Sequence, residues 1–252
     1  MTKAVRNLAA DYADEADKTD LNQIRFNLFL SASSAVKIAS SFPNAEPPAK
    51  VVDMQLTVLG SGTAVPNPKR SSAAFWVETA GGSKVVLDFS ATAVHRMMEE
   101  GLDWAEMDAI WISHFHLDHF AGLLPFLFGV GYSEEGMART KPLRIFGGAG
   151  LKALLESFSD LRDYKLLDQP FPLEIVEIET LENFEIAPGL EAVAMSTPHT
   201  DESHAIHLRD RDGSTLVYTS DTGFTETLAA FARRVDLLVI EASFPRDKPG
   251  DN

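Results

Sequence analysis

The sequence contains no cysteine, and this absence limits the chemistry that the protein can carry out. Without thiols the chain can form no disulfide and can offer no thiolate ligand to a metal ion. Any transition metal must therefore be held by histidine, aspartate or glutamate. The absence also suits a reducing compartment, so we expect a cytoplasmic protein.

Basic residues are also few, and this limits the partners of the protein. The chain has 22 Lys and Arg against 37 Asp and Glu, which gives a formal net charge of −15. Affinity for phosphate backbones and anionic membranes comes mainly from basic side chains. No apolar run is long enough to span a bilayer, and Asn27 and Lys37 interrupt the most apolar N-terminal stretch. We therefore expect a soluble protein without a membrane partner.

The first 53 residues differ in composition from the rest of the chain. They are rich in Asp, Ala and Ser, and they end in a linker-like segment over residues 43–48. One helix is predicted between Leu21 and Ser41, without chemistry of its own. From Met54 the pattern is that of a compact α/β or α+β domain. We predict a dispensable extension over residues 1–53 and one domain over residues 54–252.

Short alternating or buried apolar runs predict a strand-rich domain with helices between the strands. The predicted strands are Met54–Leu59, Ala73–Glu78, Lys84–Asp88, Ala109–Ile112, Leu143–Phe146, Leu173–Ile178, Leu190–Ser196, Ala205–Leu208, Thr215–Thr219 and Leu237–Ile240. The predicted helices are Ala91–Gly101, Phe120–Val130, Leu151–Phe158 and Thr225–Ala232.

The segment Ser113-His114-Phe115-His116-Leu117-Asp118-His119 carries the strongest chemical signal. It follows a buried strand, and in extended chain His114 and His116 point the same way, so that both can reach one metal ion. Asp118 and His119 fall at the start of the next helix, facing a neighbouring point. Core packing explains none of the four. The alternative is a polar loop whose histidines are unrelated.

Two further residues at strand ends are candidate ligands. His199 follows the strand that ends at Ser196, and Asp221 follows the strand that ends at Thr219. Functional sites of layered α/β proteins gather at such ends. The alternatives are an ordinary loop histidine and an aspartate that caps the next helix.

These residues, taken in order, resemble a known family. The pattern consists of Leu59-Gly60-Ser61-Gly62-Thr63, His114-x-His116-x-Asp118-His119, His199, and Asp221 in a Ser-Asp-Thr-Gly setting. It is similar to the metallo-β-lactamase superfamily, and within it to ribonuclease Z-like metal-dependent hydrolases. The resemblance implies a four-layer αββα sandwich with two zinc ions at one edge. It implies a first zinc held by His114, His116 and His199, a second held by Asp118 and His119, and Asp221 bridging both.

The resemblance implies a hydrolase that acts most readily on phosphodiesters. Two cations on one water lower its pKa toward neutrality and neutralise charge on the attacked and leaving oxygens. Asp118 could take the proton from that water, as is proposed for its counterpart in the family. Two alternatives stay open. One is a hydrolase of lactones or thioesters, and the other is a non-catalytic binding protein that keeps the fold.

One expected ligand of the second zinc is missing from the sequence. The family places a last histidine beyond a strand that matches Leu237–Glu241, yet no histidine follows His207. We expect the sequence to be cut short, because Glu241-Ala242-Ser243-Phe244 resembles the segment that precedes this histidine. The second site is therefore predicted to be incomplete. His204 and His207 are nearby substitutes, but their spacing on one strand favours ordinary strand positions.

Two departures from the family disfavour tRNA as the substrate. The interval between His199 and Asp221 is 22 residues, too short for the long arm that ribonuclease Z often uses for tRNA. Ile240 also stands where the family has a histidine. We expect a small-molecule or other phosphodiester substrate.

Two weaker signals complete the set. Residues 147–150, Gly-Gly-Ala-Gly, precede a predicted helix and could offer amides to a phosphate, although a plain turn is favoured. The apolar stripe over residues 123–128 indicates core, with a pocket wall or a homodimer face as the alternative.

Overall fold

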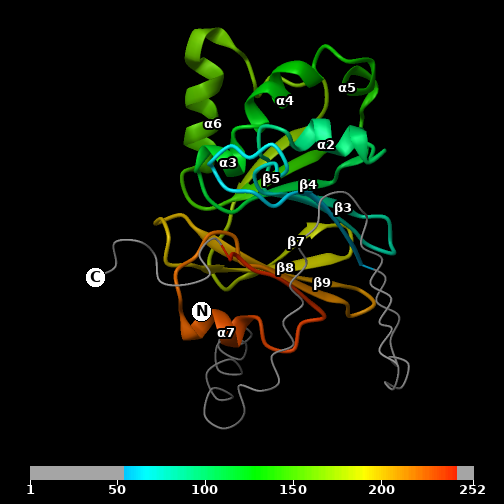
Figure 1. The fold of residues 1–252 in the computed structure, drawn as a ribbon. Helices are drawn as coiled ribbons and strands as arrows, with labels where there is room; N and C mark the ends of the chain where they lie inside the picture. The colour runs from blue at the N-terminus through cyan, green and yellow to red at the C-terminus, as the bar shows by residue number, and fades with distance from the viewer. Residues whose placement is uncertain (1–53, 243–252) are drawn as a thin grey trace.

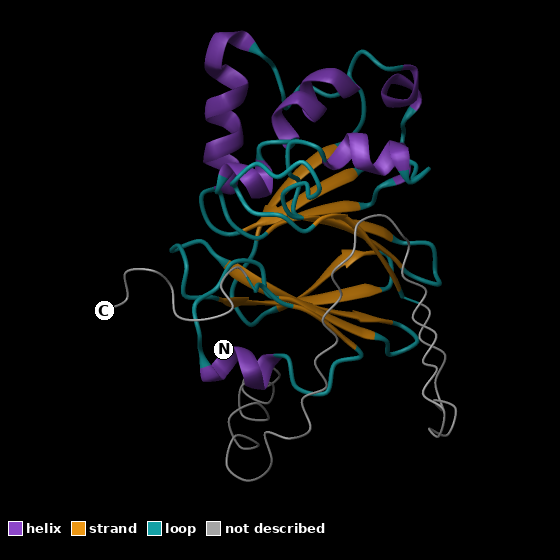
Figure 2. Cartoon of the chain, in the orientation of Figure 1, coloured by secondary structure: helices purple, strands orange, loops and turns teal. Residues whose placement is uncertain are grey.

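The computed structural model describes residues 54–242, which form two stacked β-sheets with helices on both outer faces (Figures 1 and 2). The predicted extension over residues 1–53, with its helix at Leu21–Ser41, lies outside the described residues, as do residues 243–252. Among the described residues, no helix has the length and hydropathy that crossing a membrane requires.

The first sheet has the strand order β1-β2-β3-β4-β5-β6. Strands β1, β2 and β3 pair antiparallel, whereas β3 to β6 pair parallel. Parallel neighbours need crossover connections, and here these connections carry the helices α2 to α6. The strands are β1 Gln55–Gly60, β2 Ala74–Glu78, β3 Lys84–Leu87, β4 Ala109–Ile112, β5 Leu143–Gly147 and β6 Leu173–Glu177.

The second sheet has the order β11-β10-β9-β8-β7 and is antiparallel except for the β10–β11 pair. Its strands are β7 Asn183–Ala187, β8 Leu190–Ser196, β9 His204–Asp210, β10 Thr215–Tyr218 and β11 Leu237–Val239. The helices are α2 Ala93–Glu99, α3 Leu117–Phe120, α4 Leu123–Val130, α5 Glu134–Ala138, α6 Leu151–Asp160 and α7 Glu226–Phe231. Two 3₁₀ turns, η2 Trp104–Glu106 and η3 Leu161–Asp163, lie between them.

The alternation of side chains along a strand explains how one sheet serves two cores. In β4, Ile110 and Ile112 face the helices, whereas Ala109 and Trp111 face the second sheet, and all four are buried. A strand that is covered on both faces reads as a continuous apolar run, which is the pattern of this segment. The β4 strand is thus fixed in the middle of the molecule, and the chain that leaves its end is fixed with it.

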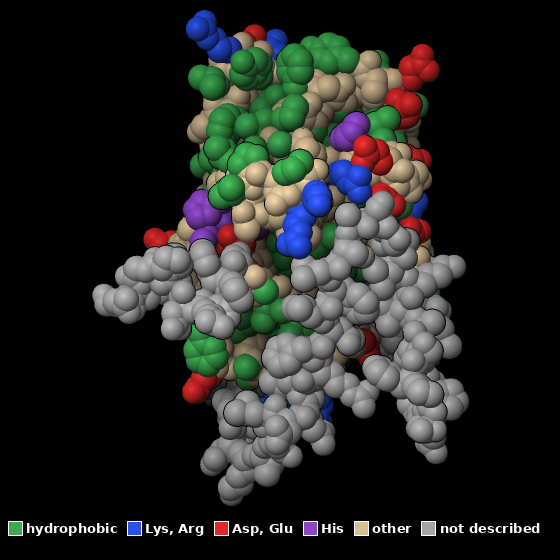
Figure 3. All heavy atoms as spheres, viewed as in Figure 1, with side chains coloured by type: hydrophobic (Ala, Val, Ile, Leu, Met, Phe, Trp, Pro, Cys, Tyr) green, Lys and Arg blue, Asp and Glu red, His purple; other side chains and the backbone are tan. Residues whose placement is uncertain are grey.

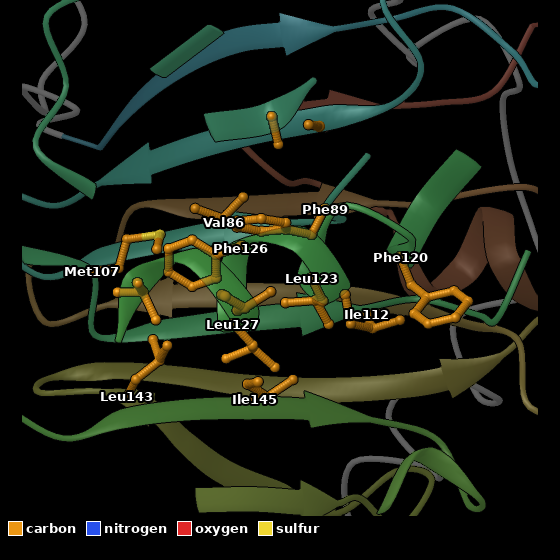
Figure 4. Close-up of a cluster of buried hydrophobic side chains, with 14 of the residues drawn as sticks. Val86, Phe89, Met107, Ile112, Phe120, Leu123, Phe126, Leu127, Leu143 and Ile145 are labelled. Atoms are coloured by element: carbon orange, nitrogen blue, oxygen red, sulfur yellow. The ribbon is translucent and has the colours of Figure 1, made fainter. Parts of the chain in front are cut away.

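Three apolar layers hold the sandwich together. On the helix side, Phe89, Leu123, Phe126 and Leu127 pack against the first sheet (Figure 4). Between the sheets, side chains of both inner faces meet, and below the second sheet α7 packs its buried Leu228 and Phe231. The predicted αββα sandwich is therefore confirmed.

Three local details differ from the sequence prediction. Strand β7 was not predicted, because its Asn-Phe-Glu-Ile-Ala sequence is half polar, as suits the edge of a sheet. The apolar run Phe120–Val130 is divided at Gly122 into α3 and α4. Most of the stripe over residues 123–128 is core, as predicted, but Phe128 is 47% exposed and lies near Tyr132 and Tyr164.

Gly122 and Gly129 lie at opposite ends of α4 and provide a matched test of this packing. A Cβ at Gly122 would lie 2.1 Å from the carbonyl oxygen of Ser90, whereas a Cβ at Gly129 would meet nothing within 4 Å. We predict that Gly122→Ala lowers the free energy of unfolding by about 1–3 kcal/mol, because the Ser90 backbone must move. Gly129→Ala should raise it by about 0.5–1 kcal/mol through helix propensity. Urea unfolding of both variants checks this, and equal effects would contradict it.

Candidate metal centre

The six candidate ligands meet at one edge of the sandwich, because each follows the end of a central strand. His114 and His116 come directly after β4, and α3 then carries Asp118 and His119. His199 follows β8 and Asp221 follows β10. Figure 3 shows histidine side chains gathered at the surface on this edge.

Three imidazole nitrogens converge in a first donor set. His116 Nδ1 lies 3.0 Å from His114 Nε2 and 3.0 Å from His199 Nε2. With a carboxylate oxygen of Asp221, these donor atoms all lie within 4.8 Å of one another. Ligands around a tetrahedral zinc with bonds of about 2.0–2.1 Å stand about 3.3 Å apart. The donor set therefore fits a single transition-metal ion.

Asp221 also faces a second, smaller donor set. Its Oδ2 lies 3.7 Å from His199 Nε2 in the first set, and its Oδ1 lies 3.4 Å from His119 Nε2. Asp118 Oδ2 lies 3.5 Å from the same nitrogen of His119. Asp221 thus stands between the two sets, as a bridging ligand would. That these residues hold metal ions stays a prediction.

Asp88 orients the residues of both sets, and the sequence analysis missed this role. Its carboxylate is fully buried at the end of β3. Oδ2 accepts hydrogen bonds from His119 Nδ1 at 2.6 Å, Tyr218 Oη at 2.6 Å and Ser113 Oγ at 2.9 Å. Oδ1 accepts one from the Ser113 amide at 2.8 Å. Because Asp88 holds Nδ1 of His119, the other ring nitrogen is turned toward Asp118 and Asp221.

Ser113 and Ser220 set the orientation of the buried His114. Ser113 Oγ lies 3.1 Å from His114 Nδ1, and Ser220 Oγ donates to Ser113 Oγ at 2.6 Å. These contacts leave Nε2 of His114 facing the first donor set. Asp88 and Ser220 have φ values of 57° and 54°, in the left-handed region. Such backbone costs about 1–3 kcal/mol per residue and recurs at functional sites, where the surrounding structure enforces it.

The two buried histidines have opposite pKa shifts. Burial lowers the pKa of His114 from 6.5 to about 4, and the positive charges of the nearby His119 and His199 contribute to this fall. Burial also lowers the pKa of His119, but the carboxylates of Asp88 and Asp221 outweigh it and raise the pKa to about 10. At neutral pH these shifts favour the neutral form of His114 and the positively charged, doubly protonated form of His119.

Burial divides the site into a floor and an open side. His114 and His119 are 0% and 2% exposed and form the floor. His116 and His199 are exposed, and Asp221 is partly exposed. The donor sets can therefore be reached from solvent without opening the core.

His204 and His207 take no part in either donor set. His204 is buried, and its Nδ1 lies 2.7 Å from the carbonyl oxygen of Glu202. The ring of His207 packs edge-on against Phe231 at 5.8 Å, on the α7 side of the second sheet. Both occupy ordinary strand positions of β9.

The glycine turn before α6 is already occupied by a carboxylate. Glu177 Oε1 accepts hydrogen bonds from the amides of Gly150 and Lys152, each at 3.0 Å. An acidic side chain from β6 thus fills the place where a phosphate would bind. The interpretation of this segment as a plain turn is the better one.

The sequence is similar to one protein family and to several ribonucleases Z. The family described as anti-Pycsar protein Apyc1 matches residues 54–248. The ribonuclease Z of Methanosarcina acetivorans is 26% identical over 235 residues, which cover 76% of this chain and 75% of that protein. The ribonuclease Z of Prochlorococcus marinus strain MIT 9301 is 24% identical over 245 residues, which cover 76% of each chain.

Solved structures share the fold at low sequence identity. The metallo-β-lactamase fold protein YhfI from Bacillus subtilis has a TM-score of 0.58 at 20% identity, covering 73% of this chain and 69% of its own. The short form of human tRNase Z has a TM-score of 0.58 at 20% identity, covering 73% and 76%. Zn²⁺-bound PqqB from Methylobacterium extorquens has a TM-score of 0.56 at 20% identity, covering 73% and 71%.

The first donor set should hold metal more tightly than the second. We predict that about one equivalent of zinc survives extensive dialysis of the full chain. His116→Ala and His199→Ala should each lose it, because each removes one of three convergent nitrogens. His95→Ala is the matched control, since His95 is an exposed histidine of α2 that pairs with Glu99. Elemental analysis after dialysis measures the retained zinc, and retention in His116→Ala would refute the assignment.

Asp88→Asn should change the protonation of His119 and weaken the second donor set. We predict a lower His119 pKa and about 10- to 100-fold weaker binding of a second zinc, because Asn lacks the negative charge with which Asp88 holds the His119 ring. Because the pKa of His119 is raised from 6.5 to about 10 in the folded protein, its protonation stabilises the fold fully below pH 6.5. This stabilisation is lost as the pH rises toward 10. The free energy of unfolding of the metal-free protein should therefore fall between pH 7 and 10, and less steeply in Asp88→Asn.

Asp108→Asn is the control for this prediction. Asp108 is also buried, but its carboxylate binds the Lys84 amide and the Lys141 side chain, at the opposite end of β4. It should reduce stability without altering the His119 titration, which is followed by NMR. An unchanged His119 pKa in Asp88→Asn would rule out the positioning role.

Proposed function

Because the chain belongs to the anti-Pycsar protein Apyc1 family, and is a ribonuclease Z-like member of the metallo-β-lactamase superfamily, we propose that it is a zinc-dependent phosphodiester hydrolase. Hydrolases among the relatives support the general reaction class. The ribonuclease Z relatives act, as their name says, on RNA, which is itself a phosphodiester.

One observation carries this proposal, namely the position of Asp221 between two donor sets. Three imidazole nitrogens lie on one side of its carboxylate, and His119 with Asp118 lies on the other. Nitrogen and carboxylate oxygen are donors that zinc prefers, and the chain has no thiolate to offer. Two bound zinc ions would lower the pKa of a water toward neutrality and neutralise charge on both the attacking and the leaving oxygen.

The residues of the site have separate tasks in this proposal. His114 and His119, held by Ser113 and Asp88, keep the floor rigid. Asp118 lies 3.5 Å from His119 Nε2 with 14% of its side chain exposed, so its second oxygen can accept a proton from an attacking water. The exposed faces of His116 and His199 leave room for the substrate.

The structure between His199 and Asp221 supports a substrate smaller than tRNA. This interval is filled by β9, a tight turn and β10, which pair with each other inside the second sheet. The chain between the two ligands therefore carries no protruding arm. The formal net charge of −15 also opposes a long polyanion.

Apolar side chains near the donor sets also support a small organic substrate. Leu117, between His116 and Asp118, is 64% exposed, and Phe224, just after Asp221, is 92% exposed. Ile240, which stands where the family has a histidine, follows β11 beside Thr219 and is 42% exposed. These side chains can contact uncharged parts of a substrate, and they add no cation for an RNA backbone.

The zinc-loaded protein should hydrolyse a bis-aryl phosphate and act poorly on a tRNA precursor. Asp118→Ala should reduce kcat at least about 100-fold, since it removes a ligand and a proton acceptor. Asp160→Ala is the control, because Asp160 is an exposed aspartate at the end of α6, remote in sequence from the donor sets. Initial rates of both variants and the wild type measure the effect.

A panel of substrates separates this proposal from its alternatives. The same zinc-loaded protein is assayed with a bis-aryl phosphate, a lactone, a thioester and a tRNA precursor. Faster turnover of the lactone or thioester would replace the phosphodiester with a carbon ester. Preferential cleavage of the tRNA precursor would reverse the substrate assignment, and no turnover of any compound would favour a non-catalytic binding protein.

A further inference from the structure

The first donor set combines residues from both sheets. His114 and His116 follow β4 of the first sheet, whereas His199 lies in the loop between β8 and β9 of the second (Figure 1). Three nitrogens can hold one zinc ion only if the two segments keep a fixed separation, because bonds from zinc to histidine vary little from about 2.0–2.1 Å. The contacts that join the two segments therefore decide how well the first set can bind.

One contact between the two segments is a backbone hydrogen bond. The His204 amide, at the start of β9, donates to the carbonyl oxygen of Ser113 at 3.0 Å. Any residue other than proline could make this bond at position 204, since no side chain takes part. The bond joins the two segments at their bases, so the position of His199 still depends on the loop that carries it.

Glu202 adds a contact close to the ligands themselves. Its Oε1 accepts a hydrogen bond from the amide of Phe115 at 3.2 Å, and Phe115 stands between His114 and His116. Burial alone would raise the pKa of Glu202, but hydrogen bonds from its own amide, from Thr200 and from the Phe115 amide lower it. The side chain is therefore an ionised carboxylate at neutral pH, and such a group is a strong acceptor for an amide.

Hydrogen bonds within the loop connect Glu202 to His199. The Ser203 amide donates to the carbonyl oxygen of Thr200 at 3.1 Å, and Ser203 Oγ accepts from the Thr200 amide at 3.1 Å. Across the base of the loop, the Thr197 amide donates to the Ser203 carbonyl oxygen at 3.0 Å. These bonds close the loop on itself, so a contact that holds Glu202 also holds His199.

Gly148 lets a third segment approach this loop closely. A Cβ at Gly148 would lie 2.6 Å from the carbonyl oxygen of Glu202 and 3.2 Å from its Cβ. His204 Nδ1 lies 2.7 Å from the same carbonyl oxygen. The turn before α6 and the His204 ring therefore both pack against Glu202, which restricts the places that its carboxylate can reach.

We propose that Glu202 is a positioning residue of the first donor set, because its bond to the Phe115 amide holds the His199 loop against the segment that follows β4. Glu202 is not one of the four convergent donors, so it acts through the backbone rather than as a ligand. This role rests on the proposed zinc centre, since the separation of the two segments matters only if the donors bind metal.

The zinc affinity of the full-length chain tests this role without any hydrolysis. Glu202→Ala should weaken binding of the first zinc about tenfold, the lower end of the usual cost of losing a residue that orients ligands. Glu202→Gln should stay within about threefold of the wild type, because its side-chain carbonyl still accepts the amide. Asp201→Ala, at the exposed neighbouring position of the same turn, is the control and should have no effect. Competition with a chromophoric chelator measures these affinities.

Two further measurements separate positioning from a general loss of stability. The visible spectrum of Co²⁺ bound in place of zinc depends on coordination geometry, so it should change in Glu202→Ala and match the wild type in Glu202→Gln. In the metal-free protein, hydrogen exchange of the Phe115 amide should be faster in Glu202→Ala than in the other variants, because that amide has lost its acceptor. Thermal unfolding verifies that each variant is folded.

The outcomes distinguish this role from the proposed function. An unchanged zinc affinity in Glu202→Ala would overturn the positioning role and leave the proposed hydrolase unaffected. An equal loss in Glu202→Gln and Glu202→Ala would also overturn it, because the charge of the carboxylate and not its hydrogen bond would then be responsible. A wild type that binds no zinc would refute the role and the proposed function together.

Discussion

The buried carboxylate of Asp88 provides the interaction on which the edge with the six candidate metal ligands depends. It joins the end of β3 to Ser113 after β4, to His119 on α3, and to Tyr218 on β10 of the opposite sheet. A fully buried carboxylate is tolerated only when its oxygens are satisfied, and here four hydrogen bonds do so. The hydrogen bond from Tyr218 also ties the first sheet to the second where the candidate ligands emerge. Removing one of these partners would leave the buried negative charge of Asp88 without full compensation. The residues that contact Asp88 therefore depend on one another for their positions.

Much of the fold could be predicted because its central strands are covered on both faces. β4 reads as an unbroken apolar run, and its neighbours β3 and β5 are mostly apolar, with Lys84 and Arg144 as the exceptions, so their burial is visible in the sequence. Strand β7 carries no such signal. It lies at the edge of its sheet, and its pairing with β8 depends on a partner rather than on its own residues. Single-sequence patterns detect what a segment buries, but they do not detect what pairs with it.

The same limit applies to the candidate site. The spacing of His114, His116 and His119 was informative because several ligating residue types stood together without a packing reason. Asp88 stood alone at a strand end, where an aspartate commonly indicates a turn, and only its three-dimensional partners reveal its role. Glu177 is the opposite case. It accepts a hydrogen bond from the amide of Gly150 at the start of α6, 27 residues earlier in the chain, and so occupies a place where a phosphate could bind. A residue that is distant in sequence can help to position a site, as Asp88 does, or can occupy a potential binding site, as Glu177 does.

The opposite pKa shifts of His114 and His119 lead us to expect an order of metal binding. Their rings lie 4.2 Å apart, yet burial keeps His114 neutral while Asp88 and Asp221 keep His119 protonated. If these sets bind metal, an ion could enter the first set without displacing a proton from His114, whereas an ion in the second set would have to displace the added proton of His119. Since Asp221 faces both sets, an ion in the first set would attract the carboxylate that helps to hold this proton. An ion in the first set would therefore make His119 easier to deprotonate, and we expect the first set to fill before the second.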